Sequence, residues 1–281
     1  MSKIPLLCSV LLLVVLLTAC IPLSGVSPTP ASPPPSLTIT TTPTLPPPAV
    51  TPTPSVARPS LALDDFTGPS LAPPIQRYLE AGGDPTTLEA MLNAIIADPA
   101  QKAPIRAEVN SVDVTGDGVD ELALTLTIPR GGDYVDTSLL VLTPQAGHYQ
   151  TILEFIRAPL ETLTDADGYR FLAIVDMNRD DTKELVVDLA IGGDHRFWIL
   201  GWDGTQIRSL LEPQQDPLTS EMVDYILIPN GTGIVRDVDG DGLLDLYTIR
   251  YRPEGEGPRH CGAKDVWSWD GTVFRHVHRV L

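Results

Sequence analysis

The sequence predicts a mainly β fold, with three four-stranded antiparallel propeller-like blades preceded by a short helical segment. Three acidic loops recur at Asp113, Asp176 and Asp237, and their starts are 63 and 61 residues apart. Strand-like runs with alternating apolar residues surround each loop, and Gly-rich or Asp-Gly turns separate them. Four antiparallel strands in each repeat are typical of a propeller blade.

The chain starts with the sequence MSKIPLLCSVLLLVVLLTAC. Lys3, the apolar run and the small residues before Cys20 predict a secretory signal over residues 1–20. An uncleaved membrane anchor is the alternative. The stretch LTAC resembles the lipobox of bacterial lipoproteins. That resemblance implies that Cys20 carries lipid and that the protein is extracytoplasmic and anchored to the bacterial cell membrane.

A segment rich in Pro, Thr and Ser follows, and Arg58 is the one charged residue before residue 61 after Lys3. Such a composition buries too little apolar surface to fold. We therefore expect a disordered tether over residues 21–70, with a reach on the order of 100 Å. The sequence leaves open whether the tether sets a fixed distance and whether it is glycosylated.

The whole chain has a formal net charge of −17. This charge disfavours nucleic acids and anionic lipid surfaces as partners and favours cations. Once Cys8 is removed with the signal and Cys20 is lipidated, Cys261 is the remaining cysteine. An internal disulfide is therefore excluded.

Residues 71–99 predict a helical segment. Asp84 is a good N-cap, and Pro85 suits the first helical position. The apolar residues that follow fall on one face of a helix: Leu88, Met91, Leu92, Ile95 and Ile96. A shorter helix is expected over 73–81, ending at Gly82.

The blades are expected within residues 100–281, at about 104–157, 168–212 and 232–281. A first strand precedes each acidic loop and a second follows it. The third strands are expected over 138–142, 196–202 and 265–269, and the fourth over 149–155, 206–211 and 273–280. The sequence Trp202-Asp203-Gly204 between the third and fourth strands recurs at residues 269–271.

The acidic loops have the residue spacing of a calcium site. Ca²⁺ binds six to eight oxygen atoms, and alternate residues of a curled loop direct oxygens to one centre. Each loop has an oxygen-bearing side chain at positions 1, 3, 5 and 9, and position 7 offers a backbone carbonyl. The ligands predicted for up to three Ca²⁺ ions are Asp113, Thr115, Asp117, Val119 and Glu121; Asp176, Asn178, Asp180, Thr182 and Glu184; and Asp237, Asp239, Asp241, Leu243 and Asp245.

The third loop matches the pattern in full. The first loop has Thr115 where Asp or Asn is usual, and the second has Asp181 in place of Gly at position 6. An EF-hand is disfavoured, because that motif needs Glu at position 12 and flanking helices. Position 12 is Leu124, Val187 or Thr248, and strand-like sequences follow.

Loops of this form between two strands resemble those of FG-GAP and VCBS repeats, which occur in integrin α-chain propellers and in bacterial surface proteins. The resemblance covers residues 100–281, although the Phe-Gly and Gly-Ala-Pro signatures are missing. It implies a propeller-like fold. The tether, the acidic loops and the lack of catalytic motifs favour a binding, adhesion or scaffold function at the cell surface, with a mainly structural role for calcium. The ligand would be a protein or a polysaccharide.

Three blades are fewer than propellers usually need to close, and open edges favour pairing with another chain. Three arrangements are open: a small closed ring, a homodimer through the blade edges, or cover by the helical segment. We expect the helices to pack on the blades.

Other chemistry has weaker support. A zinc site at His260, Cys261, His276 and His278 lacks metal-ligand spacing. We expect Asp194 and His195 in an exposed turn, and we expect Trp198, Trp202, Trp267 and Trp269 in the blade core.

No catalytic motif is recognisable, so the sequence favours a non-enzymatic protein. The alternative is a polysaccharide-active enzyme, or its accessory carbohydrate-binding domain. A pocket with acidic residues away from the calcium loops would favour this alternative.

Overall fold

We describe the fold from a computed structural model, which describes residues 59–96, 106–131, 134–161, 168–216, 219–251 and 261–277. These residues belong to one compact unit. The predicted signal, Cys20, most of the tether, His260 and His278 lie outside the described residues.

The helical segment forms as predicted. It contains a short 3-10 helix η1 (Leu63–Phe66), α1 (Ala72–Glu80) and α2 (Pro85–Ile96). Asp84 caps α2, because its carboxylate accepts the backbone N–H of Thr86 at 2.9 Å. Leu61 and Phe66 are buried, so the packed region begins within the stretch expected to be tether. Within the described residues, no helix is long and apolar enough to cross a membrane.

Sheet 1 is the first predicted blade. Its strands are hydrogen-bonded in the order β1-β2-β3-β4, and every pair is antiparallel. The strands are β1 (Ala107–Val112), β2 (Glu121–Gly131), β3 (Tyr134–Gln145) and β4 (His148–Glu161).

Sheet 2 differs from the predicted second blade in its closing strand. The order is β11-β7-β6-β5, and β8 pairs with the remaining length of β7. The strands are β5 (Gly168–Val175), β6 (Glu184–Ile191), β7 (Asp194–Trp202), β8 (Ile207–Ser209) and β11 (Ile226–Pro229).

The fourth strand predicted over 206–211 is therefore split in two. β8 pairs with residues 200–202 of β7, and β11 pairs with residues 194–197. The chain between them leaves the sheet and pairs with Phe274: the N–H of Phe274 donates to the carbonyl of Leu210 at 2.8 Å, and the N–H of Glu212 donates to the carbonyl of Phe274 at 3.0 Å. It then forms a hairpin of β9 (Gln214–Gln215) and β10 (Met222–Val223).

Sheet 3 is the third predicted blade, with the order β12-β13-β14-β15. The strands are β12 (Gly231–Arg236), β13 (Asp245–Tyr251), β14 (Cys261–Trp269) and β15 (Phe274–Val277). The fold is thus mainly β and antiparallel, as predicted. The description as three four-stranded blades is wrong in number, since the described residues form four sheets with the β9–β10 hairpin, and they form no closed propeller.

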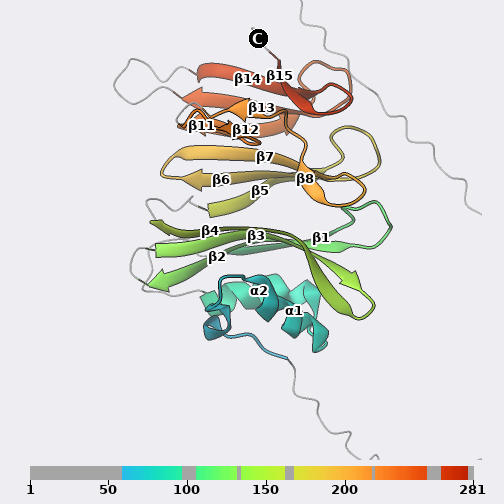
Figure 1. Ribbon diagram of the computed structural model, residues 1–281, viewed down its shortest axis with the longest axis vertical. Helices are drawn as coiled ribbons and strands as arrows, with labels where there is room; N and C mark the ends of the chain where they lie inside the picture. The colour runs from blue at the N-terminus through green and yellow to red at the C-terminus, as the bar shows by residue number, and fades with distance from the viewer. Residues whose placement is uncertain are drawn as a thin grey trace, which may run out of the picture. The chain divides into compact units, whose positions relative to one another are not determined.

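Three hydrophobic clusters lie between successive layers of the unit (Figure 1). The first joins the helices to sheet 1, the second joins sheets 1 and 2, and the third joins sheets 2 and 3. Trp198 and Trp267 are buried within the second and third clusters, and Trp202 and Trp269 pack against them. The predicted core role of the tryptophans is therefore confirmed.

The helices also cover the free edges of sheet 1. The side chain of Asn93 on α2 accepts the N–H of Ala107 at 2.7 Å and donates to its carbonyl at 2.9 Å. On the opposite edge, Gln76 of α1 donates to the carbonyl of Tyr149 at 2.8 Å. Since unpaired edge groups invite association, the expectation that helices pack on the blades is confirmed for sheet 1.

Candidate metal centres

The three acidic loops join the first two strands of each large sheet: β1 to β2, β5 to β6 and β12 to β13. All three have the same backbone shape, with a left-handed residue at positions 4 and 6. The φ angles are 76° at Gly116, 83° at Gly118, 61° at Arg179, 68° at Asp181, 81° at Gly240 and 89° at Gly242. Glycine adopts this region without strain, so the second loop reaches the same shape with less suitable residues.

A shared hydrogen-bond pattern explains the common shape. The carboxylate at position 1 accepts N–H groups from positions 4 and 6, at 2.7 and 2.8 Å for Asp113 and at 2.6 and 3.0 Å for Asp237. Asp176 accepts the corresponding N–H groups at 2.7 and 3.2 Å. These bonds curl each loop around its first acidic residue.

The acidic residue at position 9 closes each loop. Glu121, Glu184 and Asp245 are buried, and each accepts the N–H of the residue at position 2. The distances are 2.9 Å from Val114, 2.7 Å from Met177 and 2.9 Å from Val238. One oxygen of a buried carboxylate is thereby fixed to the backbone in every loop.

Position 5 binds the backbone of position 7. Asp117, Asp180 and Asp241 accept the N–H of residues 119, 182 and 243 at 2.8, 2.9 and 2.8 Å. These hydrogen bonds fix the N–H groups at position 7. The carbonyls of the same residues, Val119, Thr182 and Leu243, stay predicted ligands.

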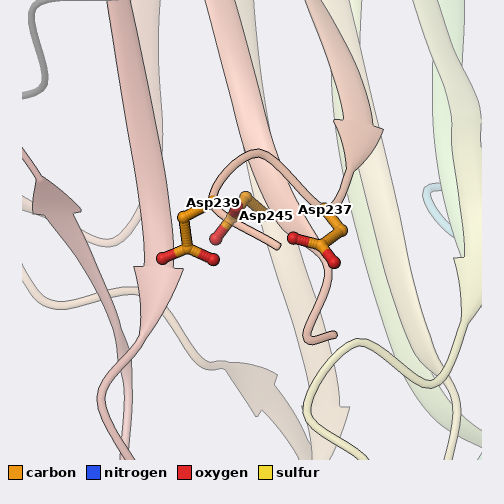
Figure 2. Close-up of side chains that lie close together, drawn as sticks. All are labelled: Asp237, Asp239 and Asp245. Atoms are coloured by element: carbon orange, nitrogen blue, oxygen red, sulfur yellow. The ribbon is translucent and has the colours of Figure 1, made fainter. Parts of the chain in front are cut away.

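The third loop brings three carboxylates together. Oxygen atoms of Asp237, Asp239 and Asp245 all lie within 4.8 Å of one another. Figure 2 shows the three side chains gathered at one loop, with Asp245 entering from the start of β13. Asp241 is not part of this group. Three clustered anions repel one another, and a divalent cation among them would remove that repulsion.

In the first loop, hydroxyl groups donate hydrogen bonds to the buried acidic residue. Glu121 accepts the hydroxyl of Thr143 at 3.1 Å and that of Thr115 at 3.4 Å, in addition to its backbone bond. Because position 3 is Thr115, the loop lacks the third carboxylate that completes the cluster in the third loop.

The second loop holds its acidic residues with neutral partners. The amide of Asn178 donates to Asp180 at 2.9 Å, and the hydroxyl of Thr182 also donates to Asp180. Burial, together with the negative charges of Asp180 and Asp176, raises the pKa of Glu184 to about 7.

The second and third loops are neighbours. The N–H of Leu244 donates to the carbonyl of Met177 at 3.0 Å. A Cβ atom added at Gly242 would lie 2.3 Å from the guanidinium of Arg179, so Arg179 packs closely on the third loop. A change in one loop can therefore affect the other.

The donor set fits a hard divalent cation. Carboxylate oxygens dominate in all three loops, and the third loop offers the three closest acidic residues. Calcium prefers such oxygen ligands and tolerates irregular geometry. Asp237, Asp239 and Asp245 would hold the ion, and its charge would link the start of β13 to the loop before it.

One buried polar network was not anticipated, and it corrects the prediction for His195. Asp194 and His195 both lie in β7 rather than in an exposed turn, and Nδ1 of His195 lies 3.0 Å from both carboxylate oxygens of Asp188. Arg170 donates its Nε–H to the same fully buried carboxylate at 2.7 Å. Only the alternation of Asp188 within an apolar strand hinted at this network, and its partners come from two other strands.

Comparisons of the chain with protein-family models, curated proteins and solved structures gave no match.

Proposed function

We propose that the protein is an extracytoplasmic calcium-binding repeat protein, anchored by lipid on Cys20 to the bacterial cell membrane, that acts as a binding, adhesion or scaffold module. The observation that carries the calcium part is the third loop, where three carboxylates converge on one point. The common backbone shape and hydrogen bonds of the other two loops support up to three ions.

Calcium has a structural role in this proposal. Each loop connects the first two strands of a sheet, and its closing acidic residue is the first residue of the second strand. An ion bound there would fix the hairpin and relieve repulsion between carboxylates. The ion would not take part in a chemical reaction, and we propose a non-enzymatic function.

The anchoring part rests on the sequence of residues 1–20 and on the Pro/Thr/Ser-rich stretch behind it. A lipid on Cys20 and a long tether would hold the repeat domain away from the membrane. A protein or polysaccharide in the surroundings would be its partner, and pairing of two copies through exposed sheet edges remains part of the proposal.

The number of calcium ions bound per chain tests the proposal that the loops bind calcium. Purified protein dialysed against micromolar calcium should retain calcium by mass spectrometry, with the third loop bound most tightly. Asp241→Ala should lower the stoichiometry more than Asp180→Ala. Equal losses would contradict the ranking of the loops, and protein without calcium would contradict the ion itself.

Lipid labelling tests the anchor. Cells expressing the full chain and fed labelled palmitate should incorporate the label, and Cys20→Ser should abolish incorporation while Cys261→Ser leaves it unchanged. Label on the Cys20→Ser protein would rule out the proposed anchor.

A further inference from the structure

The insertion that splits the closing strand of sheet 2 forms one wall of a cavity of about 250 Å³. This wall consists of the β9–β10 hairpin, Tyr225 and β11. The opposite wall comes from sheet 3 and includes Arg250 of β13, Trp267 of β14 and His276 of β15. The cavity therefore lies between two sheets and away from the acidic loops.

The residues in the sheet 3 wall differ from those at the equivalent positions of sheet 2. Aligning Trp202-Asp203-Gly204 with residues 269–271 places Asp265 at the position of Trp198, and Trp267 at that of Leu200. Trp198 and Leu200 are buried in the hydrophobic cluster between sheets 1 and 2. Packing between sheets thus favours an apolar residue at this position, where sheet 3 has the carboxylate of Asp265. Core packing therefore does not explain why Asp265 is present.

The polar groups of the sheet 3 wall are arranged around an aromatic surface. His276 lies with its Nε2 2.7 Å from Oδ1 of Asp265, and its ring centre is 4.8 Å from that of Trp267. Trp267 is only 6% exposed, yet its Nε1–H has no hydrogen-bond acceptor among the described residues. A buried donor without a partner is costly, so Trp267 leaves an unsatisfied polar group in the wall of the cavity that it lines.

The insertion wall is held in place by its own hydrogen bonds. Tyr225 donates its hydroxyl to the buried carboxylate of Asp216 at 2.6 Å. Gln214 donates its side-chain N–H to the carbonyl of Tyr225 at 2.7 Å. The wall is therefore preformed, as binding pockets usually are.

The charges select a neutral ligand. Asp216 and Asp265 disfavour an anion, and the guanidinium of Arg250 disfavours a bare cation. Carboxylate, guanidinium, imidazole and indole N–H groups together can bind several hydroxyls at once. An aromatic side chain beside these polar groups can pack against the C–H groups of an aliphatic ring in the ligand.

A second hollow adjoins the first. Tyr225 lines both, and the second has a volume of about 510 Å³. Within it, the ring of Trp198 lies 5.3 Å from that of Tyr225, and the guanidinium of Arg196 lies 5.3 Å from the centre of the Tyr225 ring. Aromatic and polar groups therefore continue past Tyr225.

We propose that the cavity between β11 and sheet 3 binds one ring of a neutral saccharide, and that the hollow beyond Tyr225 binds a neighbouring ring of the same chain. This inference specifies the ligand class of the module proposed above, and it rests on the binding part of that function rather than on calcium.

Isothermal titration of the full chain in detergent micelles tests it. The probes are the methyl pyranosides of glucose, galactose, mannose and N-acetylglucosamine, and tetrasaccharides of the same four sugars. At least one tetrasaccharide should bind saturably and more tightly than its monosaccharide. Trp267→Phe, which keeps an aromatic ring but removes the N–H, should weaken binding by at least about tenfold.

The matched control is Trp269→Phe, two residues along the same strand and outside the cavity lining, which should bind as the unaltered chain does. Arg250→Ala gives an independent test, because Arg250 is exposed and its loss should leave folding intact while weakening binding. No saturable binding to any probe, or equal binding by Trp267→Phe, Arg250→Ala and Trp269→Phe, would overturn the proposal.

Each titration is repeated in calcium and in EDTA, alongside calcium analysis of the same samples. A chain that retains calcium but binds no saccharide would overturn this inference alone. A chain that binds saccharide through Trp267 but retains no calcium would contradict only the metal sites.

Discussion

The second and third acidic loops have the same backbone shape but different groups at their centres. Both have left-handed residues at positions 4 and 6, and in both the acidic residues at positions 1, 5 and 9 accept backbone N–H groups. Position 3 is Asn178 in one loop and Asp239 in the other, and the compact group of three carboxylates occurs in the third loop. The shape of the loop and the grouping of its carboxylates thus depend on different residues.

The comparison separates two roles for an acidic residue. An acidic residue that accepts N–H groups stabilises the curled loop with or without an ion. At position 3, Asn178 and Asp239 each accept the N–H of position 5, at 3.0 and 3.1 Å. The two residues therefore differ mainly in the negative charge of Asp239, which is favourable only when a cation is bound. Substitutions at positions 3, 6 and 9 separate these two roles.

Asp245→Ala should have the largest effect. Asp245 is buried, accepts the N–H of Val238 and belongs to the carboxylate cluster. In millimolar calcium the substitution should lower the free energy of unfolding by about 2–3 kcal/mol, measured by urea denaturation. In EDTA the loss should shrink to that of the hydrogen bond, about 1 kcal/mol. The same loss in both buffers would show that Asp245 has no metal-dependent role.

The stability of the calcium-free protein should depend on pH through Glu184 of the second loop. The pKa of Glu184 is about 7 in the folded chain against an ordinary value of 4.5. Because the folded-state pKa is raised, the stability that protonated Glu184 contributes is fully present below about pH 4.5 and is lost as the pH rises through 7.

In EDTA, stability should therefore fall between pH 5 and pH 8 by on the order of 1–2 kcal/mol from this group. Glu184→Gln should remove that part of the slope, measured by denaturation across the pH range. Calcium should stabilise the unaltered chain more at pH 8 than at pH 5, because the ion and the proton compete. A Glu184→Gln slope identical to the original would refute the assignment.

Exchanging the residues at position 3 should exchange calcium affinities. Asp239→Asn gives the third loop the group that the second has, and should weaken its calcium binding by about tenfold, or about 1.4 kcal/mol. Asn178→Asp should strengthen the second site by a similar factor. Calorimetric titration of both variants is the measurement, and unchanged affinities in both would mean that position 3 does not decide affinity.

Relieving the backbone of the second loop should have the smallest effect. Asp181 has a φ of 68°, where the first and third loops have glycine. Asp181→Gly should stabilise the chain by about 0.5–1 kcal/mol in EDTA. The matched reverse change, Gly118→Asp, meets no atom within 4 Å of the added Cβ and should destabilise by a similar amount. Equal stability of both variants and the parent chain would remove strain as a difference between the loops.

The regular parts of this fold were predictable because their signals are local. The stripe from Leu88 to Ile96 predicted α2, and the residues at positions 1, 5 and 9 predicted the loop ends. Alternating apolar residues located the strands of sheets 1 and 3. Each signal arises within a dozen residues, and tertiary packing reinforces it.

Features that depend on distant partners were not predictable. Nothing in residues 206–229 indicates that β8 and β11 divide one strand position between them, because the pairing is decided by β7. The contact of His195 with Asp188 joins the neighbouring strands β7 and β6. The wall that Tyr225 forms against Trp267 joins two sheets. The predicted calcium ligands thus follow from the sequence pattern, whereas the proposed saccharide cavity follows from the insertion that interrupts this pattern.

Thermal unfolding of the full chain in millimolar calcium and in excess EDTA tests the central claim most directly. If calcium occupies the loops and links the sheet hairpins, the melting temperature should be higher in calcium by on the order of 5–10 °C, and the third-loop variant Asp245→Ala should lose most of that difference. Superimposable melting curves of the unaltered chain in the two buffers would contradict the claim.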